Sequence, residues 1–451
     1  PFLKSINMNV ESCNMLIEGR VLQPPVLEYH PKSVNHLFTP EAGRWNIANK
    51  VVVLGKNLQN WSVIVFSTER NCPKQVVRRF TQKFREVANQ KGMDVSNEPE
   101  ICYFNPVGDI RKSLYQACCT SRFNKDLPPQ LIFCVLEHTG SLYGEIKRIG
   151  DTELGVPTQV VLTKLLSRRG IDQICANIAL KVNVKLGGQN CFLSEGQLSF
   201  VSEVPTMIFG ADVFHPGRGE NKPSIAAVCG SVNRNATMYC GRYSKNEEPR
   251  NETIENLREM VDDLMRAFWE RNATLPHRIL FYRDGVSEGQ FEHVLRVEVK
   301  ALKETFCRCY KKGFEPKLTF VIVQKRHHTR FMPNEPRDGD KNANCPPGTV
   351  VDSTILVPQE FGFCKYHSDL RMIMLAIRIL INGILFHIDL QPQNVLQGTG
   401  RPIHYSVLYD ENKFTADEIQ TLTHKLCYLS ARCTLAISLV PPVHYAHLMA
   451  N

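Results

Sequence analysis

Short apolar runs alternate with amphipathic segments along the first half of the chain. The runs "WSVIVF", "ICYF", "QLIFCVLE" and "PTQVVLTKLL" are each followed by a stretch with apolar residues at helical spacing, for example "PKQVVRRFTQKFREVANQKGM". Apolar runs that precede amphipathic helices are typical of buried strands in a parallel sheet. Residues 49–190 are therefore predicted to form a Rossmann-like α/β domain, although no GxGxxG loop is present.

The pattern changes in the second half of the chain. Three consecutive strands are predicted, "TMIFGADVF", "SIAAVCGSV" and "ATMYCGRYS", followed by a long helix, "ETIENLREMVDDLMRAFWERN", and a fourth strand, "RILFYRDGV". This is the element order of a ribonuclease H core, in which the first and fourth strands lie side by side. We therefore predict a second domain of the α/β class over residues 191–451. The turn-rich residues 1–48 are predicted to be a linker segment before the first domain.

Composition adds few constraints. The 451 residues are 43% apolar and 22% charged, and 54 Lys and Arg against 45 Asp and Glu give a net charge of +9. This excess is compatible with a polyanionic partner but does not require one. The 16 cysteines form no CxxC pair, and no signal peptide is present, so we expect reduced thiols in a cytoplasmic or nuclear protein. Because the sequence begins with Pro, we expect it to be a piece of a longer protein.

Two aspartates end predicted strands. Asp212 follows the apolar "FGA" and Asp284 follows "FYR", and the expected strand order brings both to one sheet edge. A single strand-end Asp more often caps a turn, but two close carboxylates favour a bound hard cation, Mg²⁺ or Mn²⁺. A pair of such ions about 3.5–4 Å apart can hydrolyse a phosphodiester. Glu252, Glu255 and Asp262 are candidates for a third carboxylate, and the residues alone do not choose among them.

Two lysine-containing helices suggest an anion site in the first domain. Tyr143 and Lys147 are four residues apart, as are Lys181 and Lys185, so each pair shares a helix face. Lysines that converge near helix N-termini can bind a terminal phosphate, whereas the simpler alternative is a solvated basic face. The Tyr-x-x-x-Lys spacing also occurs in short-chain dehydrogenases, but without a glycine-rich cofactor loop that alternative has little support.

Several longer segments resemble one known family. "GADVFHPGRG", "FYRDGVSEGQ", "VIVQKRHHTR" and "YAHL" resemble the PIWI domain of eukaryotic Argonaute proteins. "LYGEIKRIGDTELGVPTQ" and "ALKVNVKLGGQN" resemble the MID domain, and "EGRVLQPP" resembles the linker before it. The resemblance covers nearly the whole chain and implies a Rossmann-like MID domain followed by a ribonuclease H-like PIWI domain.

The resemblance implies RNA silencing directed by a small guide RNA, and it assigns site residues by motif. The cleavage set of the family falls on Asp212, Glu252, Asp284 and His447, with Asp212, Asp284 and His447 as metal ligands, which resolves the third carboxylate in favour of Glu252. The residues expected to bind the 5′ phosphate of the guide are Tyr143, Lys147, Gln159, Lys181 and Lys185, and those expected to contact the guide backbone are Arg326, Arg401 and Arg432.

Three functions are considered for this sequence, of which the first two agree with the resemblance. The first is an Mg²⁺-dependent endoribonuclease that cuts target RNA paired to the guide. The second is a guide-binding protein that represses through partners, such as glycine-tryptophan scaffold proteins, without cutting. The third, a ribonuclease H-type enzyme without a guide, would make the MID resemblance accidental. None of the three involves a membrane.

The chain departs from the family pattern in three places. The family continues for several residues, including an arginine that reaches the 5′ phosphate, beyond the position of Asn451. The usual "EFDF" is "EFGF", with Gly362 in place of an acid. The third departure is residues 364–388, an insertion of 25 residues before "QGTGRP". Arg378, Asn382 and Gly383 interrupt its apolar run, which argues against a membrane span.

We interpret the insertion as a retained intron. Cys364-Lys-Tyr can be encoded with a splice donor, and Ile388-Asp389 with an acceptor. Removing the 75 nucleotides between them joins Phe363 to a new tyrosine and then to Leu390. The product, "EFGFYLQPQNVLQGTGRP", restores the spacing of the family.

Overall fold

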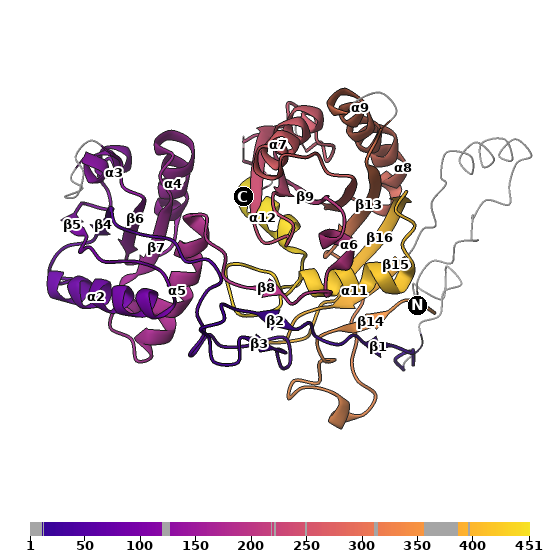
Figure 1. The fold of residues 1–451 in the computed structure, drawn as a ribbon, viewed down its shortest axis with the longest axis horizontal. Coiled ribbons are helices and arrows are strands. Elements are labelled where there is room, and N and C mark those ends of the chain that lie inside the picture. The colour runs from indigo at the N-terminus through magenta and orange to yellow at the C-terminus, as the bar shows by residue number, and fades with distance from the viewer. Residues whose placement is uncertain are drawn as a thin grey trace, which may run out of the picture.

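The structure is a computed structural model. It describes residues 11, 13–119, 127–217, 219–220, 222–248, 250–310, 314–355, 387–395 and 397–451. Figure 1 shows two α/β units side by side, with a small sheet beneath and between them. Gly362 and residues 364–386 of the predicted insertion lie outside the described residues.

The first unit is a parallel sheet covered on both faces. Its strands, in the order β5-β4-β6-β7, are β4 (Trp61–Phe66), β5 (Glu100–Tyr103), β6 (Leu131–Leu136) and β7 (Thr158–Leu162). Its helices are α2 (Lys74–Gln90), α3 (Ile110–Cys119), α4 (Ser141–Ile149) and α5 (Ile171–Lys185). Every residue of β4 and β6 is buried, as expected for central strands of a parallel sheet. The predicted Rossmann-like domain is confirmed.

Alternating side chains of β4 divide the core of this unit into two layers. Val63 and Val65 pack with α2 and α5, whereas Ile64 and Phe66 pack with α3 and α4. Because side chains alternate between the faces of a strand, one apolar run supplies both layers. The arrangement places α4 and α5, which carry the predicted phosphate-binding lysines, on opposite sides of the sheet.

The second unit contains a nine-stranded mixed sheet in the order β1-β14-β15-β16-β13-β12-β9-β10-β11. Its strands are β1 (Arg20–Val21), β9 (Thr206–Phe214), β10 (Ile225–Ser231), β11 (Tyr239–Lys245), β12 (Arg278–Asp284), β13 (Lys317–Gln324), β14 (Thr349–Val351), β15 (His387–Gln391) and β16 (Ile403–Asp410). The first and fourth predicted strands, β9 and β12, are parallel neighbours. The predicted ribonuclease H-like order is therefore confirmed.

Helices cover both faces of the large sheet. Those of the second unit are α6 (Ser199–Ser202), α7 (Leu257–Asn272), α8 (Phe291–Val294), α9 (Lys300–Cys309), α11 (Ala416–Leu426) and α12 (Pro441–Ala450). Side chains of α7 and α9 share one apolar cluster with β9, β12 and β13. Side chains of α11 and the start of α12 lie in the cluster on the opposite face. The sheet is thus the central layer of three.

The long helix predicted from Glu252 begins later than its sequence pattern suggests. Helix α7 starts at Leu257, because tertiary partners hold the preceding backbone. The N–H of Ile254 donates to Glu298, and the carbonyl of Thr253 accepts from Asn246. Glu252 therefore lies on a loop and not on the helix.

The N-terminal segment contributes to two sheets. Strand β2 (Leu27–Glu28) pairs with β3 (Leu37–Phe38) on one side and with β8 (Phe192–Leu193) on the other, and β1 pairs with β14 at the edge of the large sheet. In the described part of the chain, no helix is both long and apolar enough to cross a membrane.

Candidate functional site

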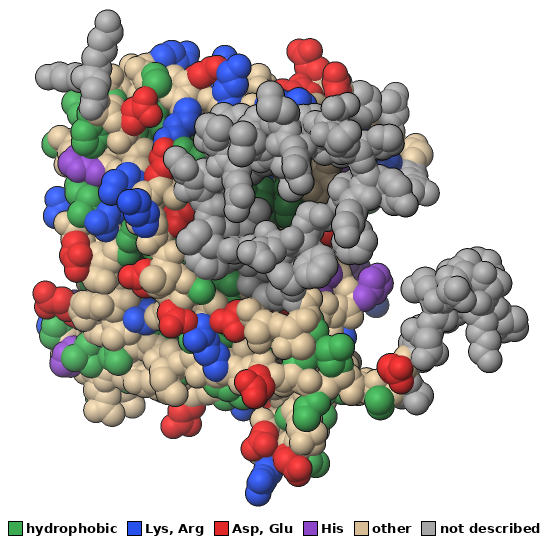
Figure 2. Space-filling model, turned by 90° about the vertical axis from the view of Figure 1, so that its right-hand side faces the viewer, with side chains coloured by type: hydrophobic (Ala, Val, Ile, Leu, Met, Phe, Trp, Pro, Cys, Tyr) green, Lys and Arg blue, Asp and Glu red, His purple; other side chains and the backbone are tan. Residues whose placement is uncertain are grey.

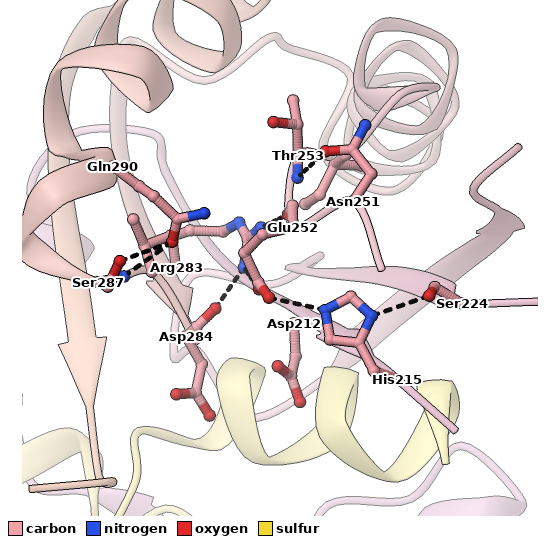
Figure 3. Close-up of polar contacts among 12 residues, drawn as sticks. Asp212, His215, Ser224, Asn251, Glu252, Thr253, Arg283, Asp284, Ser287 and Gln290 are labelled. Carbon is pink, nitrogen blue, oxygen red and sulfur yellow. Dashed lines mark hydrogen bonds and ion pairs between the residues drawn. The ribbon is translucent and has the colours of Figure 1, made fainter. Parts of the chain in front are cut away.

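Two buried carboxylates meet at one edge of the large sheet. Asp212 lies near the end of β9 and Asp284 ends β12, and both side chains point toward α12 (Figure 3). Burial and the nearby charge of Asp212 raise the pKa of Asp284. The ammonium group of Lys325, 2.7 Å from Asp284 Oδ2, opposes this shift. A cation between the two carboxylates would relieve the same repulsion.

His447 reaches Asp212 from helix α12. Its Nδ1 lies 2.6 Å from Asp212 Oδ2. The close approach of α12 depends on Gly210, because a Cβ at that position would lie 2.2 Å from the backbone carbon of Pro442. A glycine on β9, two residues before Asp212, therefore brings the helix and its histidine onto the site.

Glu252 enters the same site from the loop before α7. Its Oε2 lies 2.8 Å from Nε2 of His215, whose Nδ1 is hydrogen-bonded to Ser224 Oγ at 2.8 Å (Figure 3). A Cβ on Gly285 would lie 2.7 Å from Glu252 Oε1 and 3.8 Å from Asp212 Oδ1. Gly285 has φ of +95°, a conformation that favours glycine. The two carboxylates thus face the same glycine.

The other two candidate carboxylates have different roles. Both oxygens of Glu255 accept backbone N–H groups, from Glu247 at 2.7 Å and Glu248 at 3.2 Å. Asp262 lies on α7 and contacts Arg266 and Cys309. Of the three carboxylates that the sequence left open, the structure brings only Glu252 to the two aspartates.

Arg283 supports this arrangement from within the core. Its guanidinium is fully buried and contacts Glu252 Oε1 at 3.3 Å, the carbonyl oxygens of Glu252 and Asp284, and both oxygens of Glu298 at 3.2 and 3.3 Å. Glu298 also accepts the N–H of Ile254. Arg283 thereby ties the loop that carries Glu252 to the end of β12.

Sequence reasoning did not single out these supporting residues. His215, Arg283 and Lys325 lie inside the segments "GADVFH", "FYRD" and "VIVQK", so each is within three residues of a predicted site residue. This proximity in sequence to predicted site residues is the signal that could have identified them. Glu298, on the helix after β12, had none.

The residue types of the site fit a hard divalent cation. Carboxylate oxygens and an imidazole are suitable ligands for Mg²⁺ or Mn²⁺. Burial and, after it, the charge of Asp212 raise the pKa of Asp284, and such an ion would relieve the repulsion between the two carboxylates. Within the described residues, however, no three His, Cys, Asp or Glu side chains are grouped closely enough to form a metal site. Each carboxylate instead contacts a protein partner. Asp284 contacts Lys325, and Asp212 contacts His447. Glu252 contacts His215 and Arg283.

A second candidate site lies in the first unit, where two lysines converge on β7. Lys147 Nζ on α4 donates to the carbonyl and hydroxyl of Thr158 at 2.6 and 2.7 Å. Lys185 Nζ on α5 donates to the same carbonyl at 2.7 Å and to Gln159 Oε1 at 2.8 Å. Tyr143, one turn before Lys147, is 38% exposed. The structure thus brings together Lys147, Gln159 and Lys185, but the two lysines lie in the last turns of α4 and α5 and not near helix N-termini.

The charges of this lysine cluster interact strongly. Part of the Lys185 side chain reaches solvent, but burial of its ammonium group, with the charges of Lys147 and Arg432, lowers its pKa to about 6. Burial also lowers the pKa of Lys147 and of Lys181, and Arg432 contributes to both shifts. An anion among these four cations would reverse the shifts.

The three arginines expected along a guide backbone are in two places. Arg326 follows β13 and Arg401 precedes β16; both are exposed, and they emerge at the same end of these antiparallel neighbours. Arg432 lies instead near the lysine cluster, because the Asn190 amide bonds the carbonyl of the residue before Arg432 and the carbonyl of the residue before Lys181. The anion site is therefore composed of residues from both units.

The carboxylate site lies on the side of the large unit that faces the first unit, which carries the lysines of the second candidate site. Helix α12 and the C-terminus lie on the side of the large unit that is turned toward the first unit, and α5 belongs to that first unit (Figure 1). The opposite side, viewed in Figure 2, shows Lys and Arg side chains mixed with Asp and Glu over its described surface. On that visible face, the positive charges are not gathered into one uniform area.

Family comparisons cover most of the chain. The sequence pattern of the Piwi domain matches residues 131–372 and 385–451. The pattern of the Mid domain of argonaute matches residues 39–117. The Piwi match is interrupted within the predicted insertion.

Individual relatives give the same result. The chain is 38% identical to protein argonaute PNH1 of Oryza sativa subsp. japonica and to protein argonaute 10 of Arabidopsis thaliana, with 100% of this chain and 45% of each relative aligned. It therefore spans about half the length of these relatives. The crystal structures of Kluyveromyces polysporus Argonaute with a guide RNA and of the C-terminal lobe of a budding yeast Argonaute both superimpose with a TM-score of 0.80 at 25% identity. These matches cover 96% of this chain, with 49% and 87% of the respective yeast chains.

Proposed function

The chain belongs to the Argonaute family, and from this premise we propose that it binds a small guide RNA by its 5′ phosphate and silences complementary target RNA. The observation that carries the proposal is the cluster of Lys147, Lys181, Lys185 and Arg432. Burial and mutual repulsion lower the pKa of Lys185 to about 6, and a terminal phosphate would offset that cost. Pairing between guide and target would supply sequence specificity, while the protein contacts the backbone.

We further propose that the chain cleaves the target. Asp212, Asp284 and His447 would hold a pair of divalent ions, which would supply activation of a water and stabilisation of the leaving oxygen. Glu252 would complete the set from its loop. The chain's own contribution is to fix these groups: Gly210 admits α12, His215 and Arg283 orient Glu252, and Lys325 counters the charge of Asp284.

The direct test uses the whole chain loaded with a 5′-phosphorylated guide and a fully paired labelled target. We expect cleavage in Mg²⁺ that EDTA abolishes. Asp284→Ala should remove cleavage while guide and target binding remain. Intact cleavage by Asp284→Ala would contradict the assignment of the carboxylates.

A non-cleaving Argonaute is the second candidate. It is favoured by the insertion, because the Piwi match is interrupted at residues 373–384, shortly before the segment that contains Arg401. Such a protein would repress through partners, for which glycine-tryptophan scaffold proteins are the proposed class. Equal repression of a reporter by the wild-type chain and Asp284→Ala would support this candidate over cleavage.

We also propose that residues 364–388 are a retained intron. In the structure, Ile388 and Leu390 of β15 are buried on one face of the sheet. In the spliced product, Phe363 would take the position of Ile388 and the new tyrosine that of Asp389, so the apolar alternation of β15 is preserved. Sequencing of the transcript across this region tests the proposal: a product 75 nucleotides shorter supports it, and a single full-length product contradicts it.

A further inference from the structure

The loop that carries Arg432 is held by both units. Both backbone polar groups of Ala431, the residue before Arg432, are hydrogen-bonded: its carbonyl accepts from Asn190 Nδ2 at 2.9 Å, and its N–H donates to the Tyr445 hydroxyl at 3.0 Å. The backbone of Thr434 also accepts from the N–H of Trp45 at 3.0 Å. The position of Arg432 is thus set by hydrogen bonds to the backbone around it.

The side-chain amide of Asn190 links α5, which carries Lys181, to the loop that carries Arg432. Its second donor bond goes to the carbonyl of Leu180 at 3.1 Å. Leu180 directly precedes Lys181 on α5, and Ala431 directly precedes Arg432. The same nitrogen therefore holds the two backbone carbonyls next to the two cations, and it sets the separation between α5 and the Arg432 loop.

The orientation of Asn190 is itself fixed by a buried partner. Its Oδ1 accepts from Asn183 Nδ2 at 3.0 Å. Asn183 is fully buried, donates to the carbonyl of Leu54 at 3.0 Å and accepts the N–H of Lys56 at 3.0 Å. Asn190 is 7% exposed and has both donors and its acceptor in use. A fully satisfied buried network of this kind permits one arrangement.

Arg432 must stay close to the lysines although repulsion favours separation. Its charge lowers the pKa of Lys147, Lys181 and Lys185. Since like charges separate when they are free to move, the Asn190 bonds oppose this repulsion. We propose that Asn190 is a positioning residue of the anion pocket, which holds Arg432 beside Lys181 for a terminal phosphate. This inference rests on the proposed binding of a 5′-phosphorylated guide.

The test compares the affinities of two guide RNAs that differ only in a 5′ phosphate or a 5′ hydroxyl. Wild-type protein should prefer the phosphorylated guide. Asn190→Ala should reduce this preference about tenfold, the scale seen when groups that orient ligating residues are removed. Affinity for the hydroxyl guide should change little. Asn272→Ala is the matched control, because its amide donates to the carbonyls of Val232 and Phe268, away from the anion pocket.

A double-mutant comparison separates positioning from general destabilisation. In an Arg432→Ala background, Asn190→Ala should cause no further loss of phosphate preference, because the residue that it positions is gone. If Asn190→Ala does not fold, Tyr445→Phe takes its place in the test. This variant removes the hydrogen bond from the Ala431 N–H and should lower the same preference. The inference would be overturned if Asn190→Ala lowered the phosphate preference as much in the Arg432→Ala background as in the wild-type chain. It would also be overturned if neither Asn190→Ala nor Tyr445→Phe lowered that preference. Equal affinity of the wild-type protein for the phosphorylated and the hydroxyl guide would instead refute the proposed function.

Discussion

Individual residues of the proposed cleavage site are held by specific partners. Asp284 contacts Lys325, Asp212 contacts His447, and Glu252 contacts both His215 and Arg283. Because each carboxylate is oriented by a fixed neighbour, removal of a neighbour should misplace the carboxylate without removing it.

His215 offers a sharp test of this principle. His215→Ala removes the contact to Glu252 Oε2 and should lower the rate of target cleavage about 10–100-fold, with guide affinity unchanged. Single-turnover cleavage with saturating guide measures the effect. His293→Ala is the control, since His293 contacts the neighbouring Thr253 hydroxyl at 3.2 Å. Equal losses in both variants would show that His215 acts only through local stability.

Lys185 predicts a pH dependence of guide binding. Its pKa of about 6 leaves it mostly neutral above pH 7, and a bound phosphate raises that pKa, so binding takes up a proton. Preference for the phosphorylated guide should therefore fall between pH 7 and 9, by up to about tenfold per pH unit. The phosphate itself has its second pKa near 6 and is already ionised in this range.

The comparison variant for this measurement is Lys185→Arg. Arginine stays charged over the whole range, so the pH dependence of the preference should flatten. A dependence that is the same in Lys185→Arg and in the wild-type chain would assign the proton to another group.

At the scale of elements, an irregular helix supports the loop that carries Glu252. Between α8 and α9 the chain forms a π-helical turn, Leu295–Val299, and Glu298 lies within it. The buried carboxylate of Glu298 contacts Arg283 and the N–H of Ile254. Such turns often occur near functional sites, and this one joins the helix to the loop that bears Glu252.

Loss of this ion pair should destabilise the fold. Burial raises the pKa of Glu298 despite the charge of Arg283, so the pair offsets the cost of burying the carboxylate only in part. Glu298→Leu nevertheless leaves Arg283 buried without its main partner, and should lower the free energy of unfolding by about 3–5 kcal/mol. Urea denaturation measures this change. Asp172→Asn, which breaks an exposed pair with Lys83, should cost at most about 1 kcal/mol.

At the scale of the whole molecule, the insertion lengthens the connection between β14 and β15. Replacing Cys364 to Asp389 by one tyrosine shortens that connection to less than a third of its length. Each halving of a loop gains about 0.6 kcal/mol, so the shortened chain should be more stable by about 1 kcal/mol. Thermal unfolding of the two chains tests this expectation, and a lower midpoint for the shortened chain would argue that the insertion belongs to the fold.

The sequence alone determined the elements and the two aspartates. Strand and helix periodicity are local properties, so the parallel sheet of the first unit and the neighbouring positions of β9 and β12 followed from the pattern. Because Asp284 ends β12 and Asp212 lies near the end of β9, their shared edge followed as well. The resemblance to a family supplied Glu252 and His447, which the pattern did not.

Only the tertiary structure decided which distant groups meet. Glu252 reaches the site because tertiary hydrogen bonds delay the start of α7, and His447 does so because Gly210 admits α12. Arg432 joins the lysines through the Asn190 amide. None of these contacts leaves a periodic signal, since each depends on how closely two packed elements approach and not on the order of residues within either.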